Sequence, residues 1–148
     1  MSDLFLTDNG EYLDLFNLGT KLVLFFYPKD NTPGCTIENN DFSLLYNEFK
    51  LLGFEVIGVS KDSVESHCKF KNKYNLTFKL ISDTDGILCQ RFGVINKKSL
   101  YGKFFLGIER STFLLNEKFE IIKEWRKVSS KNHANFILDF IKNNNLSK

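Results

Sequence analysis

The residues with the clearest chemical potential lie around Cys35, in the segment PKDNTPGCT. An apolar run stops at Pro28, and a polar loop then leads into an apolar pattern with helical spacing. Thr32 suits the N-cap of that helix, Pro33 its first position and Cys35 its third. Unpaired N–H groups and the positive end of the helix dipole favour a thiolate there. The spacing therefore predicts a partly exposed, nucleophilic sulfur; the alternative is a thiol that only fills the first helical turn.

The elements that must position this sulfur alternate between strands and helices. The sequence predicts strands over residues 21–27, 54–60, 80–82, 111–115 and 119–125, helices over 33–52, 63–74, 83–92 and 130–143, and a loop at 97–107. This order indicates an α/β fold, in which a central mixed sheet with parallel strands and a late antiparallel hairpin is flanked by helices. Sites in such sheets lie at the carboxyl ends of strands, and Cys35 follows one of these ends.

Composition narrows the classes of protein that the chain can represent. Its 148 residues, 43% of them hydrophobic, suffice for a single domain over residues 1–148 with a sizeable core. The net charge is only +2 and the basic residues are scattered, so we expect no nucleic-acid partner. No apolar stretch approaches the roughly 20 residues of a membrane span, and the acidic N-terminal segment does not resemble a signal peptide. We therefore expect no membrane association and a cytoplasmic location.

The cysteines and histidines offer no metal-binding pattern. Cys35, Cys68 and Cys89 are widely spaced and odd in number, which argues against a disulfide-stapled secreted scaffold. With His67 and His133 as the only histidines, no pair has the spacing of zinc ligands, and we expect neither metal nor cofactor. We expect His67 to face the core from its helix and His133 to be a solvated surface residue.

Four segments together resemble the peroxiredoxins. The string FYPKDNTPGCT carries the signature P-x-x-x-T-x-x-C of that family, and it is similar to the bacterioferritin comigratory protein (Q-type) subfamily in particular. The segments VIGVSKDSVESHCKF, KLISDTDG and GIERSTFLL agree with the same subfamily. The resemblance extends from about Leu6 to Ile141. It implies a thioredoxin-like fold of the peroxiredoxin type.

The resemblance also implies an activity. Cys35 would be the peroxidatic cysteine, which attacks hydrogen peroxide or an organic hydroperoxide and becomes a sulfenic acid. Thr32 would donate its hydroxyl to the peroxide or the thiolate, and Arg110 would hold its guanidinium beside the sulfur. Pro28 would shield the thiolate from water, while the backbone N–H groups of Gly34 and Cys35 would complete an oxyanion pocket. Without the resemblance, Arg110 would be read as a surface ion pair.

The step that follows oxidation is less well defined by the sequence. Many relatives carry a resolving cysteine five residues after the peroxidatic one, but Asn40 stands there. Cys68 lies on the accessible side of the next helix and is the candidate for a disulfide with Cys35. Formation of this disulfide would require local opening of the site. Thioredoxin would then be the expected reductant. The alternatives are a one-cysteine enzyme resolved by an external thiol such as glutathione, or resolution by Cys89, which we expect in the core.

Other functions of a reactive cysteine require different partner residues. A thioredoxin-like dithiol reductase needs a second cysteine where Glu38 stands, and a copper chaperone of that fold needs one at Asn39. A cysteine hydrolase needs an imidazole beside the thiol, and no motif supports one. A binding module, or a redox sensor that relays oxidation to a partner protein, remains as an alternative of another class. We expect a monomer, and Trp125 is interpreted as a packing residue.

Overall fold

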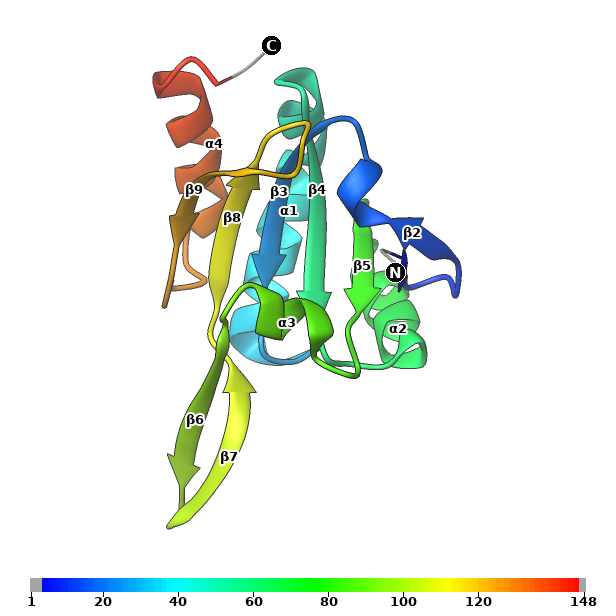
Figure 1. Cartoon of the computed structure of the whole chain (residues 1–148), viewed down its shortest axis with the longest axis vertical. Helices are drawn as coiled ribbons and strands as arrows, with labels where there is room; N and C mark the ends of the chain where they lie inside the picture. Colours follow the sequence, from blue (N-terminus) through cyan, green and yellow to red (C-terminus); the bar gives the residue numbers. More distant parts are fainter. Residues whose placement is uncertain (1–3, 147–148) are drawn as a thin grey trace.

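The computed structural model describes residues 4–146, apart from the side chains of residues 98–100 and 104–106. Its central feature is a five-stranded sheet with the strand order β5-β4-β3-β8-β9 (Figure 1). The strands are β3 (Lys21–Phe26), β4 (Phe54–Ser60), β5 (Lys79–Ser82), β8 (Ser111–Leu115) and β9 (Ile121–Trp125). β3 runs parallel to β4 and antiparallel to β8, so the predicted mixed α/β sheet is confirmed.

Helices cover both faces of this sheet, which explains the continuous apolar run at its centre. Alternate residues of β3 enter different cores: Val23 and Phe25 face one, Leu24 and Phe26 the other. The first core is closed by α1 (Pro33–Leu51), α2 (Val64–Tyr74) and α4 (His133–Asn143). The second is closed by η1 (Leu15–Asn17) and α3 (Ile87–Arg91), which lies in front of the sheet in Figure 1. A strand buried on both sides has no polar face.

The long helices begin and end close to the predicted residues. α1 starts at Pro33 with Thr32 as N-cap, and it ends before Gly53, whose φ of +89° suits glycine. α2 is capped by Ser63, whose Oγ accepts a hydrogen bond from the N–H of Ser66 at 3.1 Å. α3 is shorter than predicted because the Asp83 carboxylate caps it from outside, accepting from the N–H groups of residues 88 and 89.

Two hairpins were not predicted. The segment expected as a loop forms β6 (Ile95–Leu100) and β7 (Lys103–Ile108), which extend away from the main sheet in Figure 1. The prediction was wrong because Tyr101 precedes Gly102 at the turn and takes a φ of 53°, a conformation that Asn or Asp would signal more clearly. Near the start of the chain, β1 (Leu4–Leu6) pairs with β2 (Tyr12–Asp14).

The apolar spacing over residues 130–143 predicts that the inner face of the closing helix α4 carries Phe136, Ile137, Phe140 and Ile141. Ile137 and Ile141 are buried as expected, but Phe136, predicted on the inner face, is 53% exposed. Phe136 instead lies against the edge of Trp125 on β9, at 5.9 Å between ring centroids. Trp125 also packs against Phe140, which agrees with its interpretation as a packing residue.

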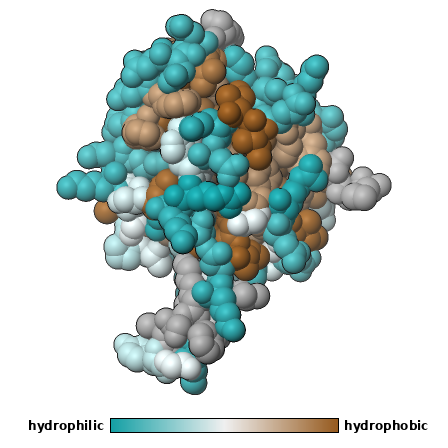
Figure 2. Space-filling view, turned by 60° about the vertical axis from the view of Figure 1, so that its left-hand side comes forward, coloured by the Kyte–Doolittle hydropathy of each residue, from teal (hydrophilic) through white to brown (hydrophobic). Residues whose placement is uncertain are grey.

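On the face shown in Figure 2, hydrophilic residues separate several small hydrophobic patches instead of leaving one continuous apolar surface. Within residues 4–146, every helix is too short or too polar to span a bilayer.

Candidate active site

The sheet topology brings Cys35 and Arg110 together from positions far apart in the sequence. Cys35 lies in the first turn of α1, just beyond the carboxyl end of β3. Because β8 is antiparallel to β3, with Phe26 opposite Ser111, the start of β8 lies at that same edge of the sheet. Arg110 directly precedes β8. Its side chain therefore extends across the beginning of α1.

The guanidinium of Arg110 contacts both the sulfur and a buried carboxylate. Its Nη2 lies 3.4 Å from Sγ of Cys35, and its Nη1 donates to Oε1 of Glu38 at 2.7 Å. Gly34 makes this approach possible, since a Cβ at that position would lie only 3.1 Å from Nη2. Burial alone would lower the pKa of Arg110, but Glu38 and Cys35 offset this effect and raise it above its usual value. The group therefore stays a cation.

Glu38 is the site residue that the sequence analysis missed. Its position excludes a dithiol motif, but in the structure Glu38 is also fully buried and pairs with Arg110. Burial raises its pKa to about 7, because the loss of solvation outweighs the attraction of Arg110. Its Oε2 has no hydrogen-bond partner among the residues described. The available signal was its position three residues after Cys35, on the same face of a helix.

Cys35 itself is more enclosed than expected. The sequence analysis anticipated a partly exposed thiol, whereas the residue is fully buried in the core that α1 shares with β3. Its carbonyl oxygen accepts a hydrogen bond from Nδ2 of Asn39 at 2.9 Å, which adds to the helical bonds of this first turn. A substrate therefore needs a small movement of the surrounding side chains to reach the sulfur.

Thr32 and Pro28 occupy the loop between β3 and α1. Thr32 takes the predicted N-cap position, but its hydroxyl donates to the carbonyl oxygen of Lys29 at 2.9 Å instead of capping the helix. Donation to a peroxide would require this hydroxyl to rotate. Pro28 is exposed at the end of the strand.

The other two cysteines lie in different environments. Cys68 is exposed on α2, as expected, and Asn72 approaches its sulfur from one helical turn further on, at 3.7 Å. Cys89 is buried on α3 within the second core, also as expected, and burial together with Asp83 raises the pKa of its thiol strongly. Both are free thiols in this structure.

The histidines depart from the predictions in one case. His67 is buried and faces the core, as predicted, with Nδ1 2.8 Å from Oδ2 of Asp30. His133, predicted as a solvated residue, is buried instead, because it starts α4 beneath β8 and its Nε2 bonds the hydroxyl of Thr112 at 2.7 Å. Burial and nearby Arg110 lower the pKa of His133 to about 4. The imidazole is therefore neutral at pH 7.

Comparisons with known proteins agree with this geometry. Residues 6–124 match the model of the AhpC/TSA family. The chain is 50% identical to peroxiredoxin Bcp of Xanthomonas campestris, over 84% of its own length and 78% of the relative. It is 47% identical to peroxiredoxin Bcp of Bacillus subtilis, over 91% and 87% of the two chains. A solved structure of a mutant of peroxiredoxin Q from X. campestris superimposes with a TM-score of 0.89 at 44% identity, covering 95% and 90%.

A thioredoxin-like fold that carries a cysteine at a helix start, beside an arginine that directly precedes a neighbouring strand, indicates the class of thiol-dependent peroxidases. The chain belongs to the AhpC/TSA family and, within it, to the Bcp or Q-type peroxiredoxins. The resemblance stated from the sequence is thereby confirmed.

Proposed function

We propose that Cys35 is the peroxidatic nucleophile of this enzyme, acting on hydrogen peroxide and organic hydroperoxides. Its thiolate attacks the terminal peroxide oxygen, a sulfur–oxygen bond forms and the oxygen–oxygen bond breaks. The leaving oxygen takes a proton from solvent and departs as water or an alcohol. Sulfur is oxidised to a sulfenic acid while the peroxide is reduced. One of the structures similar to this chain is described as an intermediate and ligand complex of the X. campestris protein in alkyl peroxide reduction.

The contact between Arg110 and Cys35 is the observation that carries this proposal. A guanidinium 3.4 Å from Sγ stabilises negative charge on the sulfur before attack. The N–H groups of the same guanidinium can also stabilise the negative charge that develops on the peroxide oxygens as their bond breaks. Because Glu38 holds Nη1, the guanidinium is oriented before the substrate arrives. Water exclusion around the buried sulfur strengthens these interactions.

Thr32 and Pro28 have supporting roles in the proposal. When a peroxide enters, the Thr32 hydroxyl turns from the carbonyl of Lys29 and donates to the substrate. Pro28 limits the access of water to the loop. The backbone N–H groups in the first turn of α1 lack intrahelical partners by geometry, and they complete the pocket for the developing charge.

Cys68 is proposed as the resolving cysteine. Its thiol attacks the sulfenic sulfur of Cys35, releasing water and forming a disulfide. Exposure of Cys68 supports this role, and it also suits attack by a dithiol reductant of the thioredoxin type on the resulting disulfide. The start of α1 must open for the two sulfurs to meet. Without this disulfide, an external thiol would have to reduce the sulfenic acid.

The enzyme is proposed to act as a monomer in a reducing compartment. Three free cysteines, one of them exposed, suit a reducing compartment such as the cytoplasm. A monomer with a single domain over residues 1–148 suffices, because Cys35, Arg110 and Cys68 all belong to one chain.

Turnover measurements test the whole proposal. Peroxide consumption is followed with thioredoxin and its reductase for the wild type, Cys35→Ser, Cys68→Ser and Cys89→Ser. We expect background activity from Cys35→Ser and loss of thioredoxin-supported turnover in Cys68→Ser, with Cys89→Ser close to the wild type. Full activity of Cys68→Ser with glutathione but none with thioredoxin in the wild type would favour the one-cysteine alternative. Slow consumption in the wild type, with fast oxidation of an added protein thiol, would favour the redox sensor.

A further inference from the structure

A cluster of polar side chains joins the loop before Cys35 to helix α2. Asp30, in that loop, is 7% exposed and lies at the centre of the cluster. Its Oδ1 accepts from the Tyr27 hydroxyl at 2.7 Å. Its Oδ2 accepts from Oγ of Ser66 at 2.7 Å and contacts Nδ1 of His67 at 2.8 Å. Two residues of α2 are thus tied to the loop through one carboxylate.

The contact between Asp30 and His67 has the geometry of a buried ion pair. Nε2 of His67 lies 2.9 Å from the carbonyl oxygen of Ile81, which can only accept a hydrogen bond. Nδ1 faces the Asp30 carboxylate, which also accepts when it is ionised. Both contacts are hydrogen bonds if the ring carries a proton on each nitrogen. Such a charge-assisted contact is stronger than a neutral one.

The carboxylate of Asp62 also holds the backbone of the loop that contains Asp30. The backbone N–H of Asp30 donates to Oδ2 of Asp62 at 2.8 Å, and the same oxygen accepts from Ser60. The carboxylates of Asp30 and Asp62 and the imidazole of His67 lie close enough to suggest a cation site, since one ligand atom from each residue lies within 4.8 Å of the others. Each of these groups already has a hydrogen-bond partner within the cluster. We therefore interpret the cluster as a tie between elements.

Cys68 lies on the side of α2 that faces away from this tie. Ser66 faces the loop, and Cys68, two residues later, is displaced by about 160° around the helix axis. A shallow pocket near Cys68 is lined by Asp8 and Asn9 of the first hairpin, together with residues of α2 itself. The loop before Cys35 and the thiol of Cys68 therefore lie on different sides of α2. The contacts of Ser66 and His67 with Asp30 therefore hold Cys68 on the side of α2 away from that loop.

We propose that Asp30 and His67 form a latch, and that its release limits the rate of the disulfide between Cys35 and Cys68. Asp30 and His67 are positioning residues: they touch neither peroxide nor sulfur, and they hold α2 in the register that keeps Cys68 away. While the latch is closed, Cys35 keeps its geometry with Arg110 and reacts with peroxide. When the latch opens, the first turn of α2 can unwind. Cys68 can then approach the sulfenic acid of Cys35. This inference rests on the proposed role of Cys68 as resolving cysteine.

Quenched-flow measurement of each thiol separates the two steps. Reduced enzyme is mixed with excess hydrogen peroxide, quenched with acid, labelled with a maleimide, and the free Cys35 and Cys68 are quantified by peptide mass spectrometry. Loss of Cys35 should depend on peroxide concentration, and loss of Cys68 should not. In Asp30→Asn, which keeps the shape and removes the charge, we expect Cys68 to be lost about tenfold faster. In Ser66→Ala, which removes one hydrogen bond, we expect an increase of about threefold.

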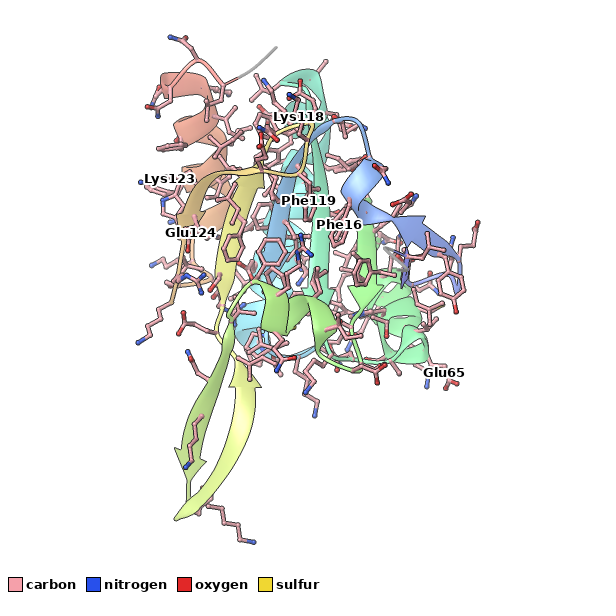
Figure 3. All side chains as sticks on the ribbon, viewed as in Figure 1. Phe16, Glu65, Lys118, Phe119, Lys123 and Glu124 are labelled. Atoms are coloured by element: carbon pink, nitrogen blue, oxygen red, sulfur yellow. The ribbon has the colours of Figure 1, made fainter. Side chains whose placement is uncertain are left out.

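Glu65→Gln is the matched control. Glu65 lies on the same first turn of α2, is exposed, and stands at the outer edge of the molecule in Figure 3. Neutralising it should leave the rate of Cys68 loss unchanged. A general disturbance of the site would also slow the reaction of Cys35 with peroxide, so a faster second step with an unchanged first step indicates release of the latch. Circular dichroism confirms that each variant is folded; if Asp30→Asn is not, Ser66→Ala carries the test.

Each outcome has a distinct meaning. Acceleration in the order Asp30→Asn, then Ser66→Ala, with Glu65→Gln unchanged, supports the latch. Unchanged or slower loss of Cys68 in the folded variants overturns it. If wild-type Cys35 is oxidised but Cys68 stays free, the latch falls together with the proposed disulfide, while the peroxidase remains. If Cys35 itself does not react, the proposed function fails independently of the latch.

Discussion

Replacing Glu38 with glutamine should change how stability depends on pH. The side chain is buried and its pKa is raised from 4.5 to about 7, chiefly by loss of solvation. Below pH 4.5 the carboxyl is protonated in the folded and the unfolded chain, and its contribution to stability is fully present. As the pH rises to about 7, the unfolded chain ionises first, and that contribution is lost. The difference between the pKa of Glu38 in the unfolded and in the folded chain corresponds to about 3 kcal/mol of unfolding free energy.

Glutamine at position 38 cannot ionise, but it can still accept the hydrogen bond from Nη1 of Arg110. We therefore expect the variant to gain stability relative to the wild type as the pH rises from 4.5 to 7, by up to about 3 kcal/mol. Urea unfolding of both proteins under reducing conditions, at several pH values across this range, measures the difference. His133 titrates in both proteins, so its effect cancels in the comparison.

The exposed Glu117 provides the control for this experiment. Glu117→Gln should leave the pH dependence of the unfolding free energy as it is in the wild type. If Glu38→Gln behaves in the same way, with a difference from the wild type that is constant from pH 4.5 to 7, the reasoning is refuted. Arg110 would then compensate fully for the burial of the carboxylate.

Three further predictions concern Arg110, the packing around Gly58 and the accessibility of Cys68 and Cys89. Arg110→Lys should lower the second-order rate constant of Cys35 with hydrogen peroxide about 100-fold in stopped-flow experiments, because an ammonium cannot contact the sulfur and Glu38 together as the guanidinium does. An unchanged rate constant would argue against the role of the guanidinium. Gly58→Ala should destabilise the fold by about 1–3 kcal/mol in urea unfolding, since a Cβ there would lie 2.8 Å from the ring of Phe25; equal stability would show that the ring can move aside. Iodoacetamide at pH 8 should label Cys68 in the native protein but leave the buried Cys89 unlabelled until urea is added. Peptide mass spectrometry measures the labelling of each cysteine, and rapid labelling of native Cys89 would contradict its burial.

The parts of the site that depend on local sequence could be predicted, because they are set by a few neighbouring residues. Thr32, Pro33 and Cys35 define a helix start through capping preferences and a fixed φ, and the structure places that helix where the pattern indicates. The double burial of β3 likewise follows from its unbroken apolar run. Arg110 was assigned through the family resemblance, since nothing local links it to Cys35. Its approach depends on the antiparallel pairing of β8 with β3.

What the sequence did not reveal depends on long-range packing or on unusual turn residues. Glu38 resembles any exposed helical acid until the tertiary fold buries it under Arg110. His133 was expected in solvent because α4 alone does not show that its first residue packs against Thr112. The hairpin around Tyr101 lacks the Asn or Asp that usually precedes glycine at such turns. The first hairpin, by contrast, carries a readable signal in Asn9–Gly10.

The central claim is that the sulfur of Cys35 is the atom that takes oxygen from the peroxide. One equivalent of hydrogen peroxide added to reduced Cys68→Ser, followed at once by a sulfenic-acid-specific probe and peptide mass spectrometry, tests it directly. The account predicts the labelled adduct on Cys35, with Cys89 unmodified, and no adduct when Cys35 is also replaced by serine. Oxidation that appears on Cys89, or peroxide that remains unconsumed while Cys35 stays reduced, would contradict the account.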